Sequence, residues 1–321
     1  MNISNDNIIF KNFSYYFIFI PILIFLVGLK DNSIWLDYYV YVDYFNQASA
    51  SSFNEIIFSL KDPFFLIINK FFSGFGFNVF VFFCAASTLY LKFSAFAKST
   101  HNIIALLFLY CSLYLFLHDY IQIRIALALA LALYAIYSVR SSIIKYIFLF
   151  SSVLVHLSIF PLVITYLFSI KKITKLSIFL YVIFNLCFIY YIKIFGGERV
   201  ESYIDFDVYN YFNFFALLPM LQLFFLIYVS LKFKSKVFSF EYFSTLMGVV
   251  LYYSLYQLPA VSTRFFEMFS IIFIIYLSNL YKRDYFFLII YFSYLFVCFY
   301  NLLIKPGAIL NQKFNFFLNF F

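Results

Sequence analysis

The chain has 321 residues, of which 65% are hydrophobic and 11% are charged, and its mean hydropathy is +0.95. Soluble domains carry roughly a quarter charged residues, so this composition excludes a soluble protein and predicts one that crosses a membrane many times. The net charge of +8 comes largely from lysines in short connections between apolar runs, which is typical of membrane topology and not of a nucleic-acid partner.

Apolar runs follow one another along the whole chain and leave no stretch long enough for a soluble domain. They predict helices at 13–29, 77–91, 102–117, 123–139, 145–170, 174–194, 214–231, 241–258, 265–281 and 285–303. The first run lacks a small-residue cleavage site, so we expect it to be retained as a helix. The segment 63–72 is too short to span and is expected to lie along the membrane or dip into it.

The run at 145–170 has basic residues at both ends and is too short for two full spans. It predicts a broken-helix hairpin, with His156 and Ser158 near the turn and Pro161 opening the second limb. A single long helix is the alternative. The sequence thus predicts an all-α polytopic membrane protein with about 11 transmembrane helices (10–12), in a single integral membrane domain of residues 1–321.

The charges of the connections orient these spans. Lysine-bearing connections predict the cytoplasmic side, to which the N-terminus also belongs. The acidic loops 30–63 and 196–213, and a short connection at 118–123, are predicted on the outer side.

Arginine is scarce in this chain, and its placement is informative. Only five of the 22 basic residues are arginines, and Arg124, Arg199 and Arg264 fall on the predicted outer side, against the usual trend. Because the planar guanidinium suits phosphate oxygens, an anionic ligand on the outer face would explain all three.

Arg124 opens an otherwise apolar helix. Ala128, Ala132 and Ala135 share its face, and small residues allow close helix approach. We therefore expect Arg124 to point into the protein, since an arginine near hydrocarbon needs a partner or a wet cavity. The alternative is that it snorkels at the helix end.

Each of the other candidates also has a purely structural alternative. Arg264 stands three residues before Glu267 and could form an intrahelical ion pair. Arg199, beside Glu198 in an acidic loop, could be a solvated surface residue. His156 is a candidate proton acceptor or phosphate ligand near the outer tip of the hairpin, or else a hydrogen-bonded interior histidine.

The remaining polar candidates are weaker. His118 and Asp119 are expected in a wet loop beside the Arg124 helix, and Asp37 and Asp43 alternate with aromatic residues, either for sugar stacking or for interfacial anchoring. The cysteines lie in apolar runs without a close pair, so neither disulfides nor a metal site is predicted. No motif for nucleotide, zinc or serine-hydrolase chemistry is present.

Several sequence elements occur in a recognisable order. They are Asp37 and Tyr41 in an outer loop, Asp62-Pro63 before an apolar turn, Gln122-Ile-Arg-Ile-Ala-Leu-Ala128, His156-Leu-Ser158, and Ser262-Thr-Arg-Phe265. As a set, they resemble the EpsG-like branch of the Wzy polysaccharide polymerases. Where many relatives have glutamine after the arginine of the helix, this chain has Ile125.

The resemblance implies an inner-membrane glycosyltransferase that polymerises O-antigen or a similar surface polysaccharide at the periplasmic face, on an undecaprenyl diphosphate carrier. It fits a mechanism in which Arg124 and Arg264, with Arg199, hold the lipid diphosphate, while His156 or Glu198 accepts the proton of the acceptor hydroxyl.

Further expectations follow for ligands and partners. The candidate substrate-binding residues are Arg199, Glu198, Asp37, Tyr41, His118 and Gln122. Neither a metal nor a cofactor is required. The expected partners are the undecaprenyl-diphosphate-linked oligosaccharide, membrane lipids and a chain-length regulator protein, with no nucleic acid.

Two other classes remain open. A flippase for lipid-linked oligosaccharides would also need an arginine-lined cavity, but with charges spread through the membrane depth and usually an internal repeat. A membrane O-acyltransferase of surface polysaccharides would need its histidine in contact with a cytoplasmic acyl donor, whereas His156 is predicted near the outside.

Overall fold

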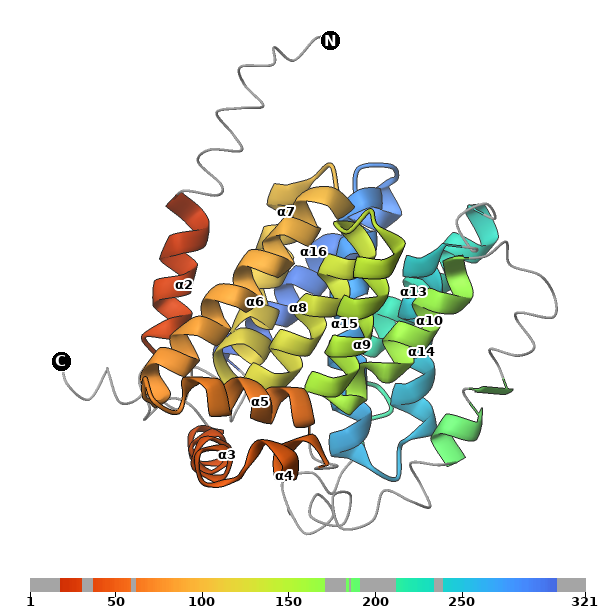
Figure 1. Ribbon diagram of the computed structural model, residues 1–321. Coiled ribbons are helices and arrows are strands. Elements are labelled where there is room, and N and C mark those ends of the chain that lie inside the picture. The colour runs from red at the N-terminus through yellow and green to blue at the C-terminus, as the bar shows by residue number, and fades with distance from the viewer. Residues whose placement is uncertain are drawn as a thin grey trace. The chain divides into compact units, whose positions relative to one another are not determined.

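The computed structural model describes residues 18–30, 37–58, 62–170, 183–184, 186–190, 212–233 and 239–304. Within these ranges every regular element is a helix and none is a strand, which confirms the all-α prediction (Figure 1). The chain divides into two compact units. Unit 1 comprises Met1–Ser99, Leu113–Ile159 and Ile309–Phe321, and unit 2 comprises Thr100–Ser112 and Phe160–Ala308. The prediction of a single integral membrane domain is not tested by this division.

Unit 1 is built around α8, which is buried on nearly every side. Its helices are α2 (Ile20–Gly28), α3 (Tyr38–Ala50), α4 (Phe53–Ile57), α5 (Pro63–Phe72), α6 (Phe77–Ser99), the later part of η2 (Tyr110–Ile121), α8 (Ile123–Tyr137), α9 (Ser142–Val155) and η3 (Leu157–Ile159). The alternation of leucine and alanine in α8 lets α6 and α9 both pack closely against it. A helix that is apolar all round is expected in the interior.

One end of unit 1 carries the short, more polar helices. Figure 1 shows α5 lying across the end of the bundle, with α3 and α4 beyond it. Near the other end, the Ser138 hydroxyl donates to the Ser94 carbonyl oxygen at 3.2 Å, so α6 and α8 run in the same direction and both begin at the α5 end. The α4 helix begins with a capping box, in which Ser52 and Glu55 satisfy each other's backbone N–H groups.

Unit 2 is built around α15. Its helices are α7 (Ile103–Leu109), α10 (Phe160–Ile170), α13 (Leu217–Lys232), α14 (Phe240–Ser254), α15 (Pro259–Leu280), α16 (Tyr285–Phe299) and η6 (Tyr300–Ile304). From Phe265 onward α15 is almost wholly buried. Its closest neighbour is α14, where Gly248 leaves room for Phe269: a Cβ at this glycine would lie 2.7 Å from the Phe269 Cβ.

Four described helices are long and apolar enough to cross a membrane: Phe77–Ser99, Ile103–Ile121, Pro259–Leu280 and Tyr285–Ile304. Shorter apolar helices, α5, α8, α9 and α13 among them, accompany these four. The protein is therefore membrane-embedded, while the predicted count of about 11 crossings is not confirmed. Most of the predicted helix at 174–194 lies outside the described residues.

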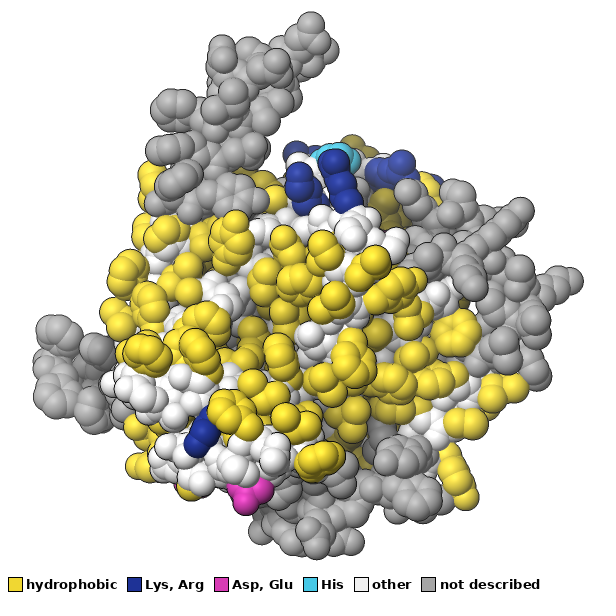
Figure 2. Space-filling model, viewed as in Figure 1, with side chains coloured by type: hydrophobic (Ala, Val, Ile, Leu, Met, Phe, Trp, Pro, Cys, Tyr) yellow, Lys and Arg dark blue, Asp and Glu magenta, His cyan; other side chains and the backbone are white. Residues whose placement is uncertain are grey.

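The exposed surface of α9 is apolar. Ile143, Tyr146, Ile147 and Phe150 are all more than half exposed. Figure 2 shows hydrophobic side chains covering this face of the molecule where α9 lies. Such a surface is stable only against hydrocarbon or another apolar partner.

Two sequence expectations need correction. The connection predicted at 118–123 is not a wet outer loop, because the helical run Ile103–Ile121 includes His118 and Asp119 and both are buried. The helix predicted at 265–281 begins six residues earlier, at Pro259, since proline is well suited to the first helical turn.

The break predicted within 145–170 is confirmed. α9 ends at Val155, His156 is extended (φ −157°, ψ 115°), and a short 3₁₀ turn leads into α10. The hairpin itself stays a prediction, because α10 belongs to the other unit.

Candidate functional site

Arg124 lies in the first turn of α8 and points into unit 1. Its Nη1 donates to Asp62 Oδ2 and to the Tyr44 hydroxyl, both at 2.6 Å, and its guanidinium lies 4.3 Å from the centre of the Tyr44 ring. Only 19% of the side chain is exposed. The inward direction expected from the alanine face is confirmed, and the arginine has a carboxylate as its partner.

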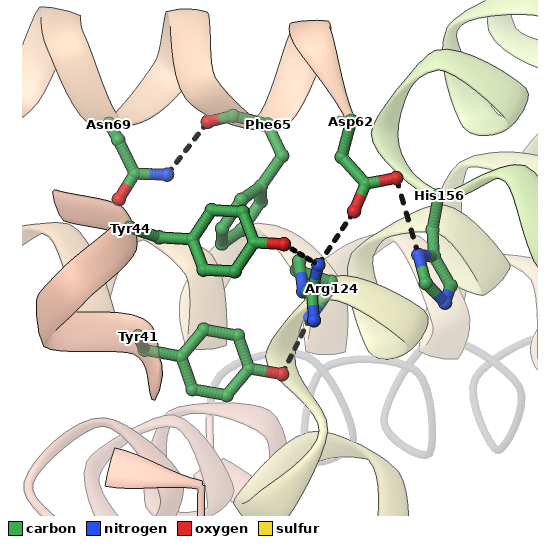
Figure 3. A network of polar contacts seen from close by, with 7 residues as sticks. All are labelled: Tyr41, Tyr44, Asp62, Phe65, Asn69, Arg124 and His156. Atoms are coloured by element: carbon green, nitrogen blue, oxygen red, sulfur yellow. Dashed lines mark hydrogen bonds and ion pairs between the residues drawn. The ribbon is translucent and has the colours of Figure 1, made fainter. Parts of the chain in front are cut away.

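Asp62 contacts both Arg124 and His156. Its side chain is 5% exposed, and while Oδ2 accepts from Arg124, Oδ1 lies 3.5 Å from Nδ1 of His156 (Figure 3). Burial alone would raise the pKa of this carboxyl, but the hydrogen bond and charge of His156 and the charge of Arg124 outweigh burial and lower the pKa. Asp62 is therefore held as a carboxylate.

The backbone at Asp62 is strained. Its φ of 49° and ψ of 58° are left-handed, and the next residue, Pro63, begins α5. A residue before proline strongly prefers extended conformations, so this geometry persists only where surrounding contacts enforce it. The strain is confined to a residue whose side chain makes the central contacts of the site.

Two tyrosines of α3 complete the surroundings of Arg124. Tyr41 and Tyr44 share one helix face, and both rings meet Phe65 of α5 edge-on, with centroids about 6 Å apart. The backbone N–H of Arg124 donates to the Tyr41 hydroxyl at 3.4 Å. Burial raises the pKa of Tyr41 to about 12, so this phenol stays neutral at physiological pH.

His156 reaches the site from the break after α9. The extended backbone at this residue ends the helix, and its carbonyl accepts from the N–H of Ile159, which starts the following turn. Its side chain is 20% exposed. Arg124, Asp62 and His156 thus come from three separate segments, and Figure 3 shows them converging.

A second cluster of charge lies in unit 1, where Asp119 is paired with Lys92 of α6. Both side chains are fully buried, and Lys92 Nζ lies 2.8 Å and 3.0 Å from the two carboxylate oxygens. The next residue, Tyr120, accepts a 2.6 Å hydrogen bond from Lys30 at its carbonyl oxygen. Burial lowers the pKa of Lys30 to about 7. These lysines fix the end of η2, directly before the helix of Arg124.

His118 is not placed as predicted. Its side chain is fully buried within η2, and its ring stacks on Tyr114 with centroids 5.9 Å apart. A substrate sugar would have to displace packed helices to reach it. The expectation of a solvent-accessible histidine here is therefore wrong, because the charge of Asp119 finds a partner inside the protein and the chain stays helical.

The other predicted residues are distributed as follows. Gln122 and Asp37 occupy the positions just before α8 and α3, and neither caps its helix through the side chain. Arg264 lies in unit 2, in the second turn of α15, where its charge acts on Glu267 one turn further on. Glu198 and Arg199 lie outside the described residues. Among the described residues, no three His, Cys, Asp or Glu side chains are grouped to hold a metal ion.

Sequence reasoning did not select Asp62, Tyr44 or Lys92 as site or partner residues. For Asp62 a signal was present, because an Asp-Pro pair stands before an apolar segment too short to span. For Tyr44 the signal was its spacing of three residues from Tyr41. Lys92 gave no signal beyond that of a topology lysine.

The fold and the site define a helical membrane protein in which a buried carboxylate meets a partly exposed arginine and a partly exposed histidine at one end of its first unit. The model of the EpsG family matches residues 13–317, nearly the whole chain, so the chain belongs to the EpsG family, which is the Wzy-like polymerase family. Neither the curated proteins nor the solved structures gave a match.

Proposed function

We propose that this protein is a glycosyltransferase that polymerises undecaprenyl-diphosphate-linked oligosaccharide repeat units into O-antigen or a similar polysaccharide. The observation that carries the proposal is the convergence of Arg124 and His156 on the buried carboxylate of Asp62. An anion ligand and a group able to accept a proton are what such a transfer needs.

Arg124 is the group proposed to bind the donor's diphosphate. Its guanidinium offers a planar set of donors that fits phosphate oxygens. As the bond between the anomeric carbon and the diphosphate breaks, negative charge grows on the leaving oxygen, and a fixed cation there lowers the barrier. The transfer then requires no metal.

His156 is the group proposed to accept the proton. The hydroxyl of the acceptor sugar attacks the anomeric carbon, the new glycosidic bond forms, and the lipid diphosphate leaves with the bonding electron pair. The hydroxyl proton passes to the imidazole, whose other nitrogen faces Asp62. Tyr41 and Tyr44 would hold Arg124 in place.

Charge distribution supports the periplasmic face as the reaction side. Lys98, Arg140 and Lys145 belong to the end of unit 1 where α6 and α8 finish and α9 begins. The positive-inside rule favours the cytoplasm for this end, which supports a periplasmic position for the Arg124 end. We accordingly propose a bacterial inner-membrane protein with a cytoplasmic N-terminus, working with membrane lipids and a chain-length regulator protein.

The roles predicted for Arg264, Arg199 and Glu198 remain proposals that rest on sequence alone. Arg264 would be a further phosphate ligand, and replacing it by glutamine tests this. The expected result is shorter polysaccharide chains at normal protein level.

A gel of surface polysaccharide from a deletion strain tests the main proposal. The strain should carry single repeat units, and the native protein should restore the ladder, whereas Arg124→Gln and His156→Gln should not. Arg140→Gln is the matched control, because this exposed arginine lies at the opposite end of α8.

Other outcomes would contradict the proposal. A normal ladder from Arg124→Gln at normal protein level would remove Arg124 from the reaction. Complete loss of repeat units from the surface would favour a flippase, and a normal ladder with altered acetylation would favour an O-acyltransferase.

A further inference from the structure

The carboxylate of Asp62 lies between Arg124, which is proposed to bind the diphosphate, and His156, which is proposed to accept the proton. Its contact with Arg124 is short, at 2.6 Å, whereas its contact with His156 is long, at 3.5 Å. Each contact uses a different oxygen. Asp62 thus makes a short contact with the arginine and a longer one with the histidine.

A diphosphate that binds Arg124 has to compete with this carboxylate. The Nη1 of Arg124 already donates to Asp62 and to Tyr44. A diphosphate carries more negative charge and more acceptor oxygens than a carboxylate, so it can replace Asp62 as the main partner. The carboxylate would then be buried beside an anion unless it found another donor, and His156 is that donor.

We propose that Asp62 changes its main partner, neutralising Arg124 before the donor binds and forming a shorter, stronger hydrogen bond with His156 once the donor's diphosphate occupies Arg124. This inference rests on the proposed function. Asp62 is then a positioning residue for the base: it accepts from Nδ1–H, which fixes the tautomer and lets Nε2 take the proton of the acceptor hydroxyl. Donor binding and activation of the base are thereby coupled.

The local geometry suits such an exchange. Aspartate has a short side chain, and because its two oxygens already face the two partners, the exchange needs a small rotation of the carboxylate and no helix movement. The strained backbone before Pro63 fixes the position from which the side chain turns. Tyr41 and Tyr44, which face Arg124 from α3, are phenols and do not replace the carboxylate.

The variant Asp62→Asn distinguishes the partner exchange from a role in which Asp62 only holds Arg124 in place, because the two models predict opposite changes in diphosphate affinity. Without the competing carboxylate, inorganic diphosphate should bind the purified protein roughly tenfold more tightly, while polymerisation kcat falls by about a hundredfold. Titration calorimetry in detergent measures the diphosphate affinity, and an assay with lipid-linked repeat units measures kcat. Glu55→Gln is the matched control, because Glu55 is an exposed carboxylate on α4 outside the site and both values should stay unchanged. If Asp62 only held Arg124 in place, diphosphate would bind Asp62→Asn more weakly, which would overturn the exchange.

A measurement on the unaltered protein covers the case in which Asp62→Asn does not fold. With ¹⁵N-labelled histidine, the chain gives three pairs of ring-nitrogen signals, of which the pair of His156 is identified by its loss in His156→Gln. Saturating inorganic diphosphate should shift the His156 Nδ1 signal toward a stronger hydrogen bond. Binding without this shift would overturn the exchange alone, whereas failure of diphosphate to bind at all would overturn the proposed function as well.

Discussion

Asp62 is the residue at which conformation and charge are most closely linked. A left-handed aspartate before a proline costs about 1–3 kcal/mol, and here the cost is offset by contacts with two ionisable partners. Glycine would relieve the strain but would leave Arg124 without its carboxylate. The site therefore depends on a residue that local conformational preference alone would not select.

Lys30 gives a pH-dependent prediction at the same scale. Burial lowers its pKa from the usual 10.5 of lysine to about 7, so between these pH values the unfolded chain binds a proton that the folded chain does not. The folded state therefore gains stability as the pH rises through this interval. We expect the thermal midpoint in detergent to increase from pH 7 to pH 9, as measured by size-exclusion chromatography after heating.

The variant Lys30→Met should abolish this increase, since the buried ammonium is then absent. Lys98→Met, at an exposed position of α6, should retain it. An unchanged increase in Lys30→Met would assign the effect to another group.

At the scale of elements, the contact between α14 and α15 depends on the absence of a side chain at Gly248. An added Cβ would approach the Phe269 Cβ to 2.7 Å, and that atom is fixed to its backbone. We expect Gly248→Ala to destabilise the protein by roughly 1–3 kcal/mol, visible as a lower thermal midpoint. Gly74→Ala is the control, because nothing lies within 4 Å of the added methyl. Equal midpoints for the two variants would contradict this packing argument.

The ion pair between Lys92 and Asp119 joins α6 to η2 and gives a second prediction. Lys92→Met leaves a buried carboxylate without its partner, and such losses cost about 3–5 kcal/mol. The double variant Lys92→Met/Asp119→Leu removes both charges and should recover most of the lost stability. Protein yield and thermal midpoint in detergent measure both effects. If the double variant were as unstable as Lys92→Met, the loss of stability could not be assigned to the unpaired carboxylate of Asp119.

At the scale of the whole molecule, the orientation of unit 1 in the membrane is the property to test. With the native cysteines replaced, a cysteine at Glu55 should react with a membrane-impermeant reagent added to the periplasmic side. Glu55 is exposed on α4, and Figure 1 shows α4 beyond α5 at the end of unit 1 where α8 begins. A cysteine at Arg140 should react only after permeabilisation. The reverse pattern would place the site on the cytoplasmic side and contradict the proposed reaction.

The sequence predicted the fold class, the direction of Arg124 and the break at His156, but it did not predict every part of the site. Composition and apolar runs predicted an all-α membrane protein, the alanine face of α8 predicted that Arg124 points inward, and the sequence around His156 predicted a break. The connection at 118–123 was predicted wrongly, because a charged residue in an apolar run indicates a loop unless its partner is known.

The sequence by itself determined the class of protein, since mean hydropathy and the spacing of apolar runs depend on residues close together in the chain. Only the tertiary structure decided the partners of its charged residues. Asp62 and Arg124 are 62 residues apart, and Lys92 and Asp119 are 27 apart. Burial in a medium without water requires that each charge find an opposite charge or a donor, but which one it finds depends on how the helices pack.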